Sequence, residues 1–426
     1  MKKKEIKNSF WLIYDKIFRL LGIVVFNLLL TNYLGASFTG EYHFIVAFGY
    51  IFYAISLFGL DAQLMNELIV KKYSEQKLLV NSVVIRFLLG IALYFLLIII
   101  SYFFNNFSDI NLNLLLVIGI QLFFQPFQVL ATFFDTKLES KKPVIIRNIA
   151  ISCSVILRIL LVIYFPDLRL ILLAYILEPF LEGCILFLFL KNKDFKLSIK
   201  DCNVDVAKYL LGKSWPLAFS SIFYVLYSKS DQVMLGFMVD KAQVGNYSLA
   251  VRFSELSYFI PVAFVKSIFP SLVEIREDRE KYYKLFQKYM NWMFNVSLAI
   301  AIIMIFIPNE LFIYILGEDM TEVSSSFKVL MFGAIFVYMG NLSHVWYISE
   351  GYQKLSLLRT STGLVLNIIL NLILISYYGI IGAAIATVIT KSYVVYFANL
   401  LDKRTYKMFN IQSKAMFNLF NWSNKY

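Results

Sequence analysis

Long apolar runs separated by short polar segments recur along the whole chain. A helix needs about 20 apolar residues to cross a hydrocarbon core about 30 Å thick, and most of the runs reach that length. The runs are continuously apolar instead of alternating, which favours helices over the strands of a closed barrel. The pattern therefore predicts an all-α membrane protein with twelve transmembrane helices, near residues 10–31, 42–66, 80–104, 112–134, 144–165, 168–190, 212–238, 246–270, 286–307, 326–349, 356–377 and 379–400.

Composition places the chain in the same class. Hydrophobic residues make up 59% of it, against about 45–50% in soluble proteins. The three cysteines, Cys153, Cys184 and Cys202, form no Cys-x-x-Cys pair, and the two histidines are too few for a metal cluster. The sequence also has no phosphate-binding loop. We therefore expect no cofactor apart from a possible coupling ion, H⁺ or Na⁺.

The net charge of +12 is spread over short loops in an alternating pattern. Lysine and arginine gather on one side of the predicted spans, most densely between Lys191 and Lys213, whereas Arg169 and Lys241 lie on the other side. Because cytoplasmic loops carry such an excess, the pattern predicts a multi-pass protein of the cytoplasmic membrane with both termini in the cytoplasm. The basic residues form no single patch, so a nucleic-acid partner is not expected.

The longest hydrophilic connection predicts two lobes. It covers residues 191–212 and divides the predicted helices into two sets of six. We expect an N-terminal lobe at 1–190, a cytoplasmic linker at 191–212, a C-terminal lobe at 213–400 and a basic cytoplasmic tail at 401–426. Transporters commonly place a substrate site between such halves, so a central cavity is expected between the lobes.

Charged residues inside the apolar spans are the candidates for function. A charge at the bilayer centre costs at least about 2.5 kcal/mol, so such residues usually face a bundle interior or a water-filled cavity. Arg252 lies three residues before Glu255, on one helical face. Arg158 and Lys391 each lie among apolar neighbours, and all three cations are predicted to bind an anionic substrate.

Further charges allow either binding or pairing. Asp15 and Arg19 are four residues apart and can pair on one face. Glu178 and Glu182 could carry a coupling ion, or pair with Arg147 or Arg158 across the bundle. Arg86 is expected to reach the cytoplasmic surface. The complete candidate set is Arg252, Arg158, Lys391, Arg147 and Arg19 for substrate binding, and Asp15, Asp61, Glu178, Glu182, Asp231 and Glu255 for coupling or ion pairing.

Two stretches resemble a known family. The first runs from Asp231 through Leu235-Gly236, Val244-Gly245-x-Tyr247-x-x-Ala250, Arg252 and Glu255 to Pro261, and the second is LNIILNLILISYYGIIGAAIATVIT at 366–390. Both resemble bacterial polysaccharide flippases of the Wzx type, in the multidrug/oligosaccharidyl-lipid/polysaccharide exporter superfamily. The end of the second predicted span, FGLDAQLMNELIVKK at 58–72, also resembles the family. Asn66 departs from the family pattern there, which often has arginine directly before the glutamate that Glu67 matches.

The resemblance implies a substrate, a membrane and a biosynthetic pathway. It implies a flippase that moves undecaprenyl-pyrophosphate-linked oligosaccharides across the bacterial inner membrane by alternating access, for O-antigen, lipopolysaccharide or capsule assembly. The implied partners are membrane lipid, a polysaccharide polymerase and a chain-length regulator.

Two other functions fit the sequence less well. A multidrug exporter needs an acidic pocket for drug cations, whereas several deep charges here are basic. A membrane-embedded polymerase or glycosyltransferase needs a sizeable outer loop, and the longest one, residues 309–325, is acidic with no basic residue. We therefore expect a transporter and not an enzyme.

Overall fold

The computed structural model describes residues 3–70, 72–104, 111–137, 139–191, 198–275, 277–316 and 321–417. Within these ranges the regular structure is entirely helical. Residues 192–197 of the predicted linker, 317–320 of the acidic loop and 418–426 of the predicted tail lie outside the described residues.

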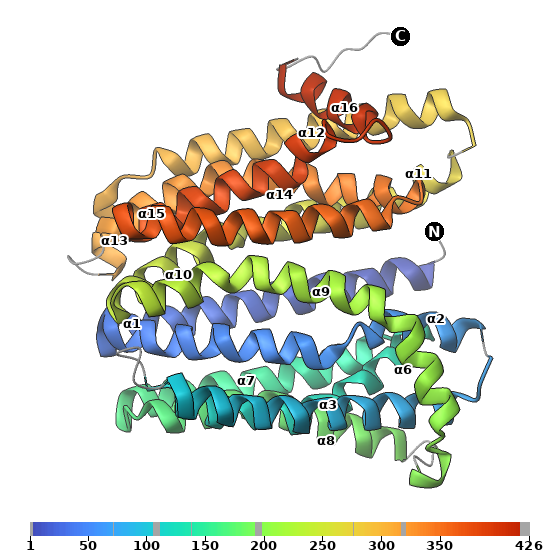
Figure 1. Ribbon diagram of the computed structural model, residues 1–426, viewed down its shortest axis with the longest axis vertical. Helices are drawn as coiled ribbons and strands as arrows, with labels where there is room; N and C mark the ends of the chain where they lie inside the picture. The colour runs from blue at the N-terminus through green and yellow to red at the C-terminus, as the bar shows by residue number, and fades with distance from the viewer. Residues whose placement is uncertain are drawn as a thin grey trace. The chain divides into compact units, whose positions relative to one another are not determined.

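The chain divides into two compact units, Met1–Gly245 and Asn246–Tyr426. In the first unit α1 packs against α7 and α9, and α7 packs against α8 (Figure 1). Its helices are α1 (Lys3–Leu57), α2 (Leu60–Val70), α3 (Glu75–Phe104), α4 (Leu114–Gly119), α5 (Gln121–Phe124), η2 (Gln125–Leu130), α6 (Ala131–Thr136), α7 (Lys141–Tyr164), α8 (Leu168–Lys191), η3 (Ile199–Asp201) and α9 (Val204–Met238).

The second unit is built around α14, which packs against α12 and α15. The helix α10 (Lys241–Glu255) begins in the first unit and ends in the second. It is followed by η4 (Leu256–Tyr258), α11 (Phe259–Glu274), α12 (Arg279–Ile305), α13 (Asn309–Leu316), α14 (Thr321–Ser349), α15 (Gln353–Val395), η6 (Phe397–Asn399) and α16 (Tyr406–Phe417).

The structure has the long apolar helices of a multi-pass membrane protein. Nine helices within the described residues are long and apolar enough to cross a membrane. Two of these stretches, Tyr14–Leu68 and Lys354–Asn399, have 55 and 46 residues, so each is long enough for two crossings of about 20 residues. Each contains a glycine with positive φ, Gly35 (77°) in the first and Gly379 (53°) in the second. Gly379 lies where the sequence predicts a turn between two spans. The total of twelve crossings stays a prediction.

Two of the interrupted predicted spans contain a proline at or beside a break. The span predicted at 112–134 is divided into α4, α5, η2 and α6, with Pro126 at the start of η2. The span predicted at 246–270 is divided by η4. There Pro261 has no N–H to donate to the carbonyl of Ser257, and the Tyr338 hydroxyl donates to that carbonyl at 2.9 Å instead.

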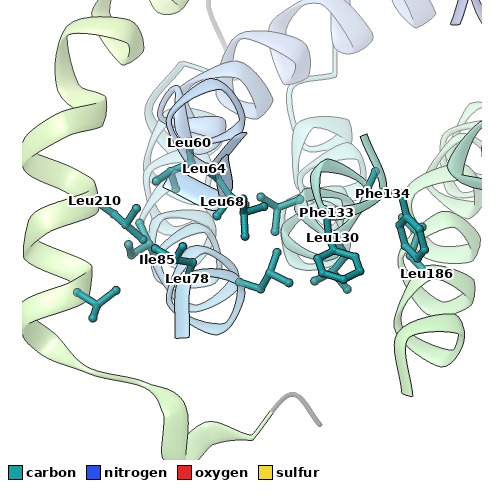
Figure 2. Close-up of a cluster of buried hydrophobic side chains, with 14 of the residues drawn as sticks. Leu60, Leu64, Leu68, Leu78, Ile85, Leu130, Phe133, Phe134, Leu186 and Leu210 are labelled. Atoms are coloured by element: carbon teal, nitrogen blue, oxygen red, sulfur yellow. The ribbon is translucent and has the colours of Figure 1, made fainter. Parts of the chain in front are cut away.

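A buried cluster holds the start of α9 against the first unit. Leu210 of α9 packs with Leu60 and Leu64 of α2 and with Leu78 and Ile85 of α3 (Figure 2). This helix therefore begins inside the predicted linker, at Val204, as a packed part of the unit. The predicted lobe boundaries at 191–212 stay a prediction.

Backbones of α1 and α10 meet at two glycines. A Cβ added at Gly40 would lie 1.5 Å from the Lys241 carbonyl oxygen, and one at Gly245 would lie 2.3 Å from that of Ala36. The Gly40→Ala substitution should therefore destabilise the protein by at least the 1–3 kcal/mol that is typical of overpacking. The thermal unfolding midpoint of the detergent-solubilised protein measures this loss.

Gly212→Ala in α9 is the matched control. A Cβ there meets nothing within 4 Å, so this helical alanine should be neutral or stabilising. An unchanged midpoint for Gly40→Ala would contradict the close approach of α1 and α10.

Candidate functional site

Five of the predicted charged residues form one cluster in the first unit. Helix α1 supplies Asp15 and Arg19, α7 supplies Arg147, and α8 supplies Glu178 and Glu182. The four-residue spacing in α1 and in α8 places both members of each pair on one helical face. The cluster forms because these faces of α1 and α8 are both turned toward the α7 arginine.

Arg147 lies between two carboxylates. Its Nη1 is 2.8 Å from Asp15 Oδ2, and its Nε is 2.9 Å from Glu182 Oε1. Beside it, Arg19 Nη2 is 2.7 Å from Glu178 Oε1. The Glu182 side chain is only 2% exposed. A buried carboxylate of this kind is tolerated only with such charge-assisted partners.

Two neutral side chains extend the cluster. Gln128 of η2 donates from Nε2 to Glu182 Oε2 at 2.6 Å. The Tyr53 hydroxyl of α1 donates to Gln128 Oε1 at 3.0 Å. A continuous polar chain therefore runs from Asp15 through Arg147, Glu182 and Gln128 to Tyr53. It fixes the orientation of both Glu182 oxygens.

The cluster borders a cavity of about 500 Å³. Its polar lining is Arg19, Tyr53, Asp61, Arg86, Gln128, Thr132, Asp135, Arg147 and Glu182. Three guanidinium groups and three carboxylates therefore line it, and the Asp15 and Glu178 carboxylates lie just behind. Each lining guanidinium is within 3 Å of a carboxylate oxygen. An anion that enters the cavity therefore competes with these carboxylates for the arginines.

The position of the Arg86 side chain differs from the sequence prediction. It was expected at the cytoplasmic surface, but its side chain is 1% exposed and its Nη2 lies 2.8 Å from Asp61 Oδ1. The same nitrogen is 3.5 Å from the Leu57 carbonyl oxygen, where α1 ends before the positive-φ residues Phe58 and Gly59. Because α3 begins at Glu75, Arg86 lies about three turns inside the helix, too deep to reach the surface.

Arg158 and Asp231 lie apart from this cluster. Arg158 is buried in α7, where Nη1 donates to the Tyr42 hydroxyl at 3.1 Å. Its guanidinium carbon lies 4.6 Å from the ring centre of Phe26 and 5.4 Å from that of Tyr175. Aromatic faces therefore stabilise this cation. Asp231 is buried in α9 and accepts from the backbone N–H of Gln232 at 2.8 Å.

The remaining predicted residues lie in the second unit. Arg252 Nη1 is 3.2 Å from Glu255 Oε2, and both side chains are half-buried. Lys391 Nζ donates to the Tyr258 hydroxyl at 3.2 Å.

Sequence reasoning missed several polar residues. Tyr53, Gln128 and Asp135 line the cavity. Tyr53 and Gln128 have no charged neighbour one turn away, and Asp135 lies beside Lys137 and Glu139 at the polar end of its predicted span. Arg359 of α15 is also buried and donates to the Tyr347 hydroxyl, to Asn399 Oδ1 at 2.5 Å and to Thr405 Oγ1 at 2.6 Å. Its partners are 12, 40 and 46 residues away, so no local pattern reveals them. Within the described residues, no group of three or more His, Cys, Asp or Glu could hold a metal ion.

Comparison with known families gives two matches. A family model described as polysaccharide biosynthesis protein matches residues 6–276. A second model, described as MatE, matches residues 216–373.

Individual proteins match along parts of the chain. The probable flippase AglR of Haloferax volcanii is 30% identical over 177 residues, which are 38% of this chain and 35% of the relative. The uncharacterized membrane protein MJ1375 of Methanocaldococcus jannaschii is 27% identical over 253 residues, 56% of this chain and 59% of the relative. The chain therefore matches less than two thirds of the length of each.

One solved structure shares the fold along almost the whole chain. The lipid II flippase MurJ, in an inward-closed conformation, aligns with a TM-score of 0.75 at 18% identity, covering 97% of this chain and 92% of that one.

Removing the shared arginine should test whether the cluster holds the first unit together. Arg147→Ala leaves Asp15 and Glu182 buried without their cation, which costs about 3–5 kcal/mol. The thermal unfolding midpoint should fall strongly, and adding Glu182→Gln should recover part of the loss.

Arg404→Ala is the control, because Arg404 pairs with Asp402 on an exposed surface. This variant should unfold close to the wild-type midpoint. Equal shifts from Arg147→Ala and Arg404→Ala would contradict a structural role for the buried cluster.

Proposed function

Because the chain belongs to the polysaccharide biosynthesis protein family, we propose that it is a flippase that moves lipid-linked oligosaccharides across a membrane. The observation that carries the proposal is the charged cavity of about 500 Å³ among the long apolar helices of the first unit. The finer proposal is an undecaprenyl-pyrophosphate-linked repeat unit, translocated across the bacterial cytoplasmic membrane for O-antigen or capsule assembly. The relative named a probable flippase and the MurJ-like fold support this proposal.

Arg19 and Arg147 are the proposed receptor for the phosphate groups. A guanidinium offers a planar fork of donors that fits a phosphate through two parallel hydrogen bonds. In the resting arrangement, Glu178 holds Arg19, while Asp15 and Glu182 hold Arg147. The incoming phosphate therefore competes with these carboxylates for the guanidinium groups.

This competition gives a physical reason for coupling to protons. A carboxylate that loses its arginine to a phosphate is left buried beside another negative charge, which favours its protonated form. Proton uptake on the displaced carboxylate would then stabilise the exchanged state, and proton release would favour return of the arginine and expel the anion. We propose H⁺ as the coupling ion on this ground.

The predicted topology places the cavity in the cytoplasmic half of the first lobe. Asp15 lies early in the first predicted span and Glu182 late in the sixth, and the ends nearest to both are predicted to be cytoplasmic. A substrate assembled in the cytoplasm would enter on that side. The lobes at 1–190 and 213–400 would then alternate access about the 191–212 linker.

We propose that the second lobe supplies further contacts to the anionic group of the substrate. Arg252 and Lys391 bind the anion there, and Asp231 and Glu255 balance their charge. Arg158, buried against Phe26 and Tyr175, becomes a contact only in a conformation that exposes it. Asp61 keeps Arg86 in place. In this proposal the protein is not an enzyme, and a polymerase and a chain-length regulator act on its product.

An ion-coupled exporter of organic cations is the alternative. The MatE match over residues 216–373 and the acidic groups around the cavity favour it. A cation substrate would need the carboxylates and would not need the guanidinium groups. Transport that survives loss of the arginines therefore distinguishes this function from the flippase.

Two substitutions of Arg252 test the proposed flippase activity in cells that lack their own flippase gene. Arg252→Lys should keep the protein in the membrane and lose part of the surface glycan, because lysine cannot copy the forked contact. Arg252→Ala should lose about tenfold or more, since a contact to a charged group contributes about 1.5–3 kcal/mol. The readout is surface glycan per unit of folded, membrane-inserted protein.

Arg279→Ala is the control, because Arg279 pairs with Glu350 and is largely exposed. It should leave glycan production unchanged. If Arg252 serves only to pair with Glu255, its alanine variant should instead lower protein abundance, and Arg252→Ala with Glu255→Ala should restore it. Normal glycan from Arg252→Ala at equal abundance would remove this residue from the site.

A further inference from the structure

A second cavity, of about 400 Å³, lies wholly within the second unit. Its wall is apolar and includes Phe253, Ile260, Met304, Leu311, Phe312 and Met331. Ser257 contributes the one hydroxyl group, which donates to the Ser254 carbonyl at 3.3 Å. The lining therefore offers nothing to a polar ligand.

The cavity exists because two neighbouring helices are interrupted. The break at η4, next to Pro261, separates α10 from α11. On the other side, α12 ends at Ile305, and the short helix α13 follows from Asn309. Asn309 Oδ1 ties the start of α13 to α14, because it accepts from Ser324 Oγ and from Lys328 Nζ, each at 2.7 Å.

The surroundings limit what can enter. The walls belong largely to Lys241–Val265, Arg279–Ile305 and Glu322–Tyr347, which are all long and apolar enough to cross a membrane. Tyr314 of α13 is 89% exposed and Phe306 is 81% exposed, as expected for aromatic side chains at a membrane interface. The cavity therefore borders lipid hydrocarbon, and a soluble peptide has no access to it.

A pair of polar residues lies next to wall residues of the cavity. Lys328 directly follows the wall residue Phe327, and Asn309 lies two residues before the wall residue Leu311. An ammonium group has three donors, and the Asn309 contact uses one of them. The donors that remain could bind a phosphate beside the cavity.

We propose that this cavity binds one acyl chain of a bilayer phospholipid, with the lipid phosphate at Lys328. Protein interiors contain few voids larger than a water molecule, so an apolar cavity of this size in a membrane is filled by hydrocarbon. The volume is at the small end of the roughly 300–1,000 Å³ range of ligand pockets, which suits one acyl chain and not a long polyprenyl tail. The bound chain would brace α13 against α12 and α14. This inference is independent of the proposed flippase activity.

Photolabelling in nanodiscs tests the site. The probe is a phosphatidylglycerol with a diazirine in one acyl chain, and labelled peptides are identified by mass spectrometry. Labelling of Met304 and Met331 should saturate as the mole fraction of probe rises. Labelling of their neighbours Ile303 and Phe332, which are largely exposed, should rise linearly, because those residues face bulk lipid.

Variants give the matched comparison. Met331→Trp fills the cavity and should abolish saturable labelling at Met304 while leaving labelling at Ile303 unchanged. Lys328→Gln should raise the half-saturating mole fraction of probe about two- to fivefold, the range for a partly exposed charge contact.

Three results would overturn the proposal. The first is linear labelling at Met304 and Met331 in the wild type, a result that does not depend on any variant folding. The second is saturable labelling at Met304 that persists in Met331→Trp. The third is an unchanged half-saturation in Lys328→Gln, which would remove the phosphate contact.

Discussion

A charge inside an apolar bundle has to be paired, and this requirement organises the first unit. Taking a guanidinium or a carboxylate out of water costs several kcal/mol per ion, which only close partners offset. Arg147 satisfies Asp15 and Glu182 together, and Gln128 satisfies the remaining oxygen of Glu182. These contacts join α1, α7, α8 and η2 around one cavity. The groups that stabilise the fold are therefore the same groups that an anionic substrate would need.

Backbone groups face the same constraint as charges. A carbonyl freed by a helix break has no water to bind within the hydrocarbon, so a side chain has to reach it. The Tyr338 hydroxyl does this for Ser257 below the Pro261 break, and the Arg86 guanidinium approaches Leu57 beside the Phe58–Gly59 break. Each break also shapes a cavity: the first borders the apolar cavity of the second unit, and the second borders the charged cavity of the first.

Local patterns in the sequence predict the membrane class, the turn at Gly379 and the family. The four-residue spacing also places Asp15 with Arg19, and Glu178 with Glu182, on single helical faces. Contacts between helices are beyond such patterns. Arg147 and Asp15 are 132 residues apart. Arg86 was expected at the surface because it lies early in its predicted span, and no local pattern reveals its partner Asp61 on another helix. Periodicity identifies the face of a helix, whereas packing decides which faces meet.

The most direct test of the account is proton uptake on binding of a phosphate ligand. Purified protein in weakly buffered detergent would be titrated with a short-chain prenyl pyrophosphate, while bound ligand and bulk pH are followed together. The wild type should take up protons as the ligand binds. The double variant Asp15→Asn, Glu182→Gln should bind the ligand without proton uptake. Wild-type binding with no change in bulk pH, or uptake that persists in the double variant, would contradict exchange of carboxylate for phosphate at Arg147.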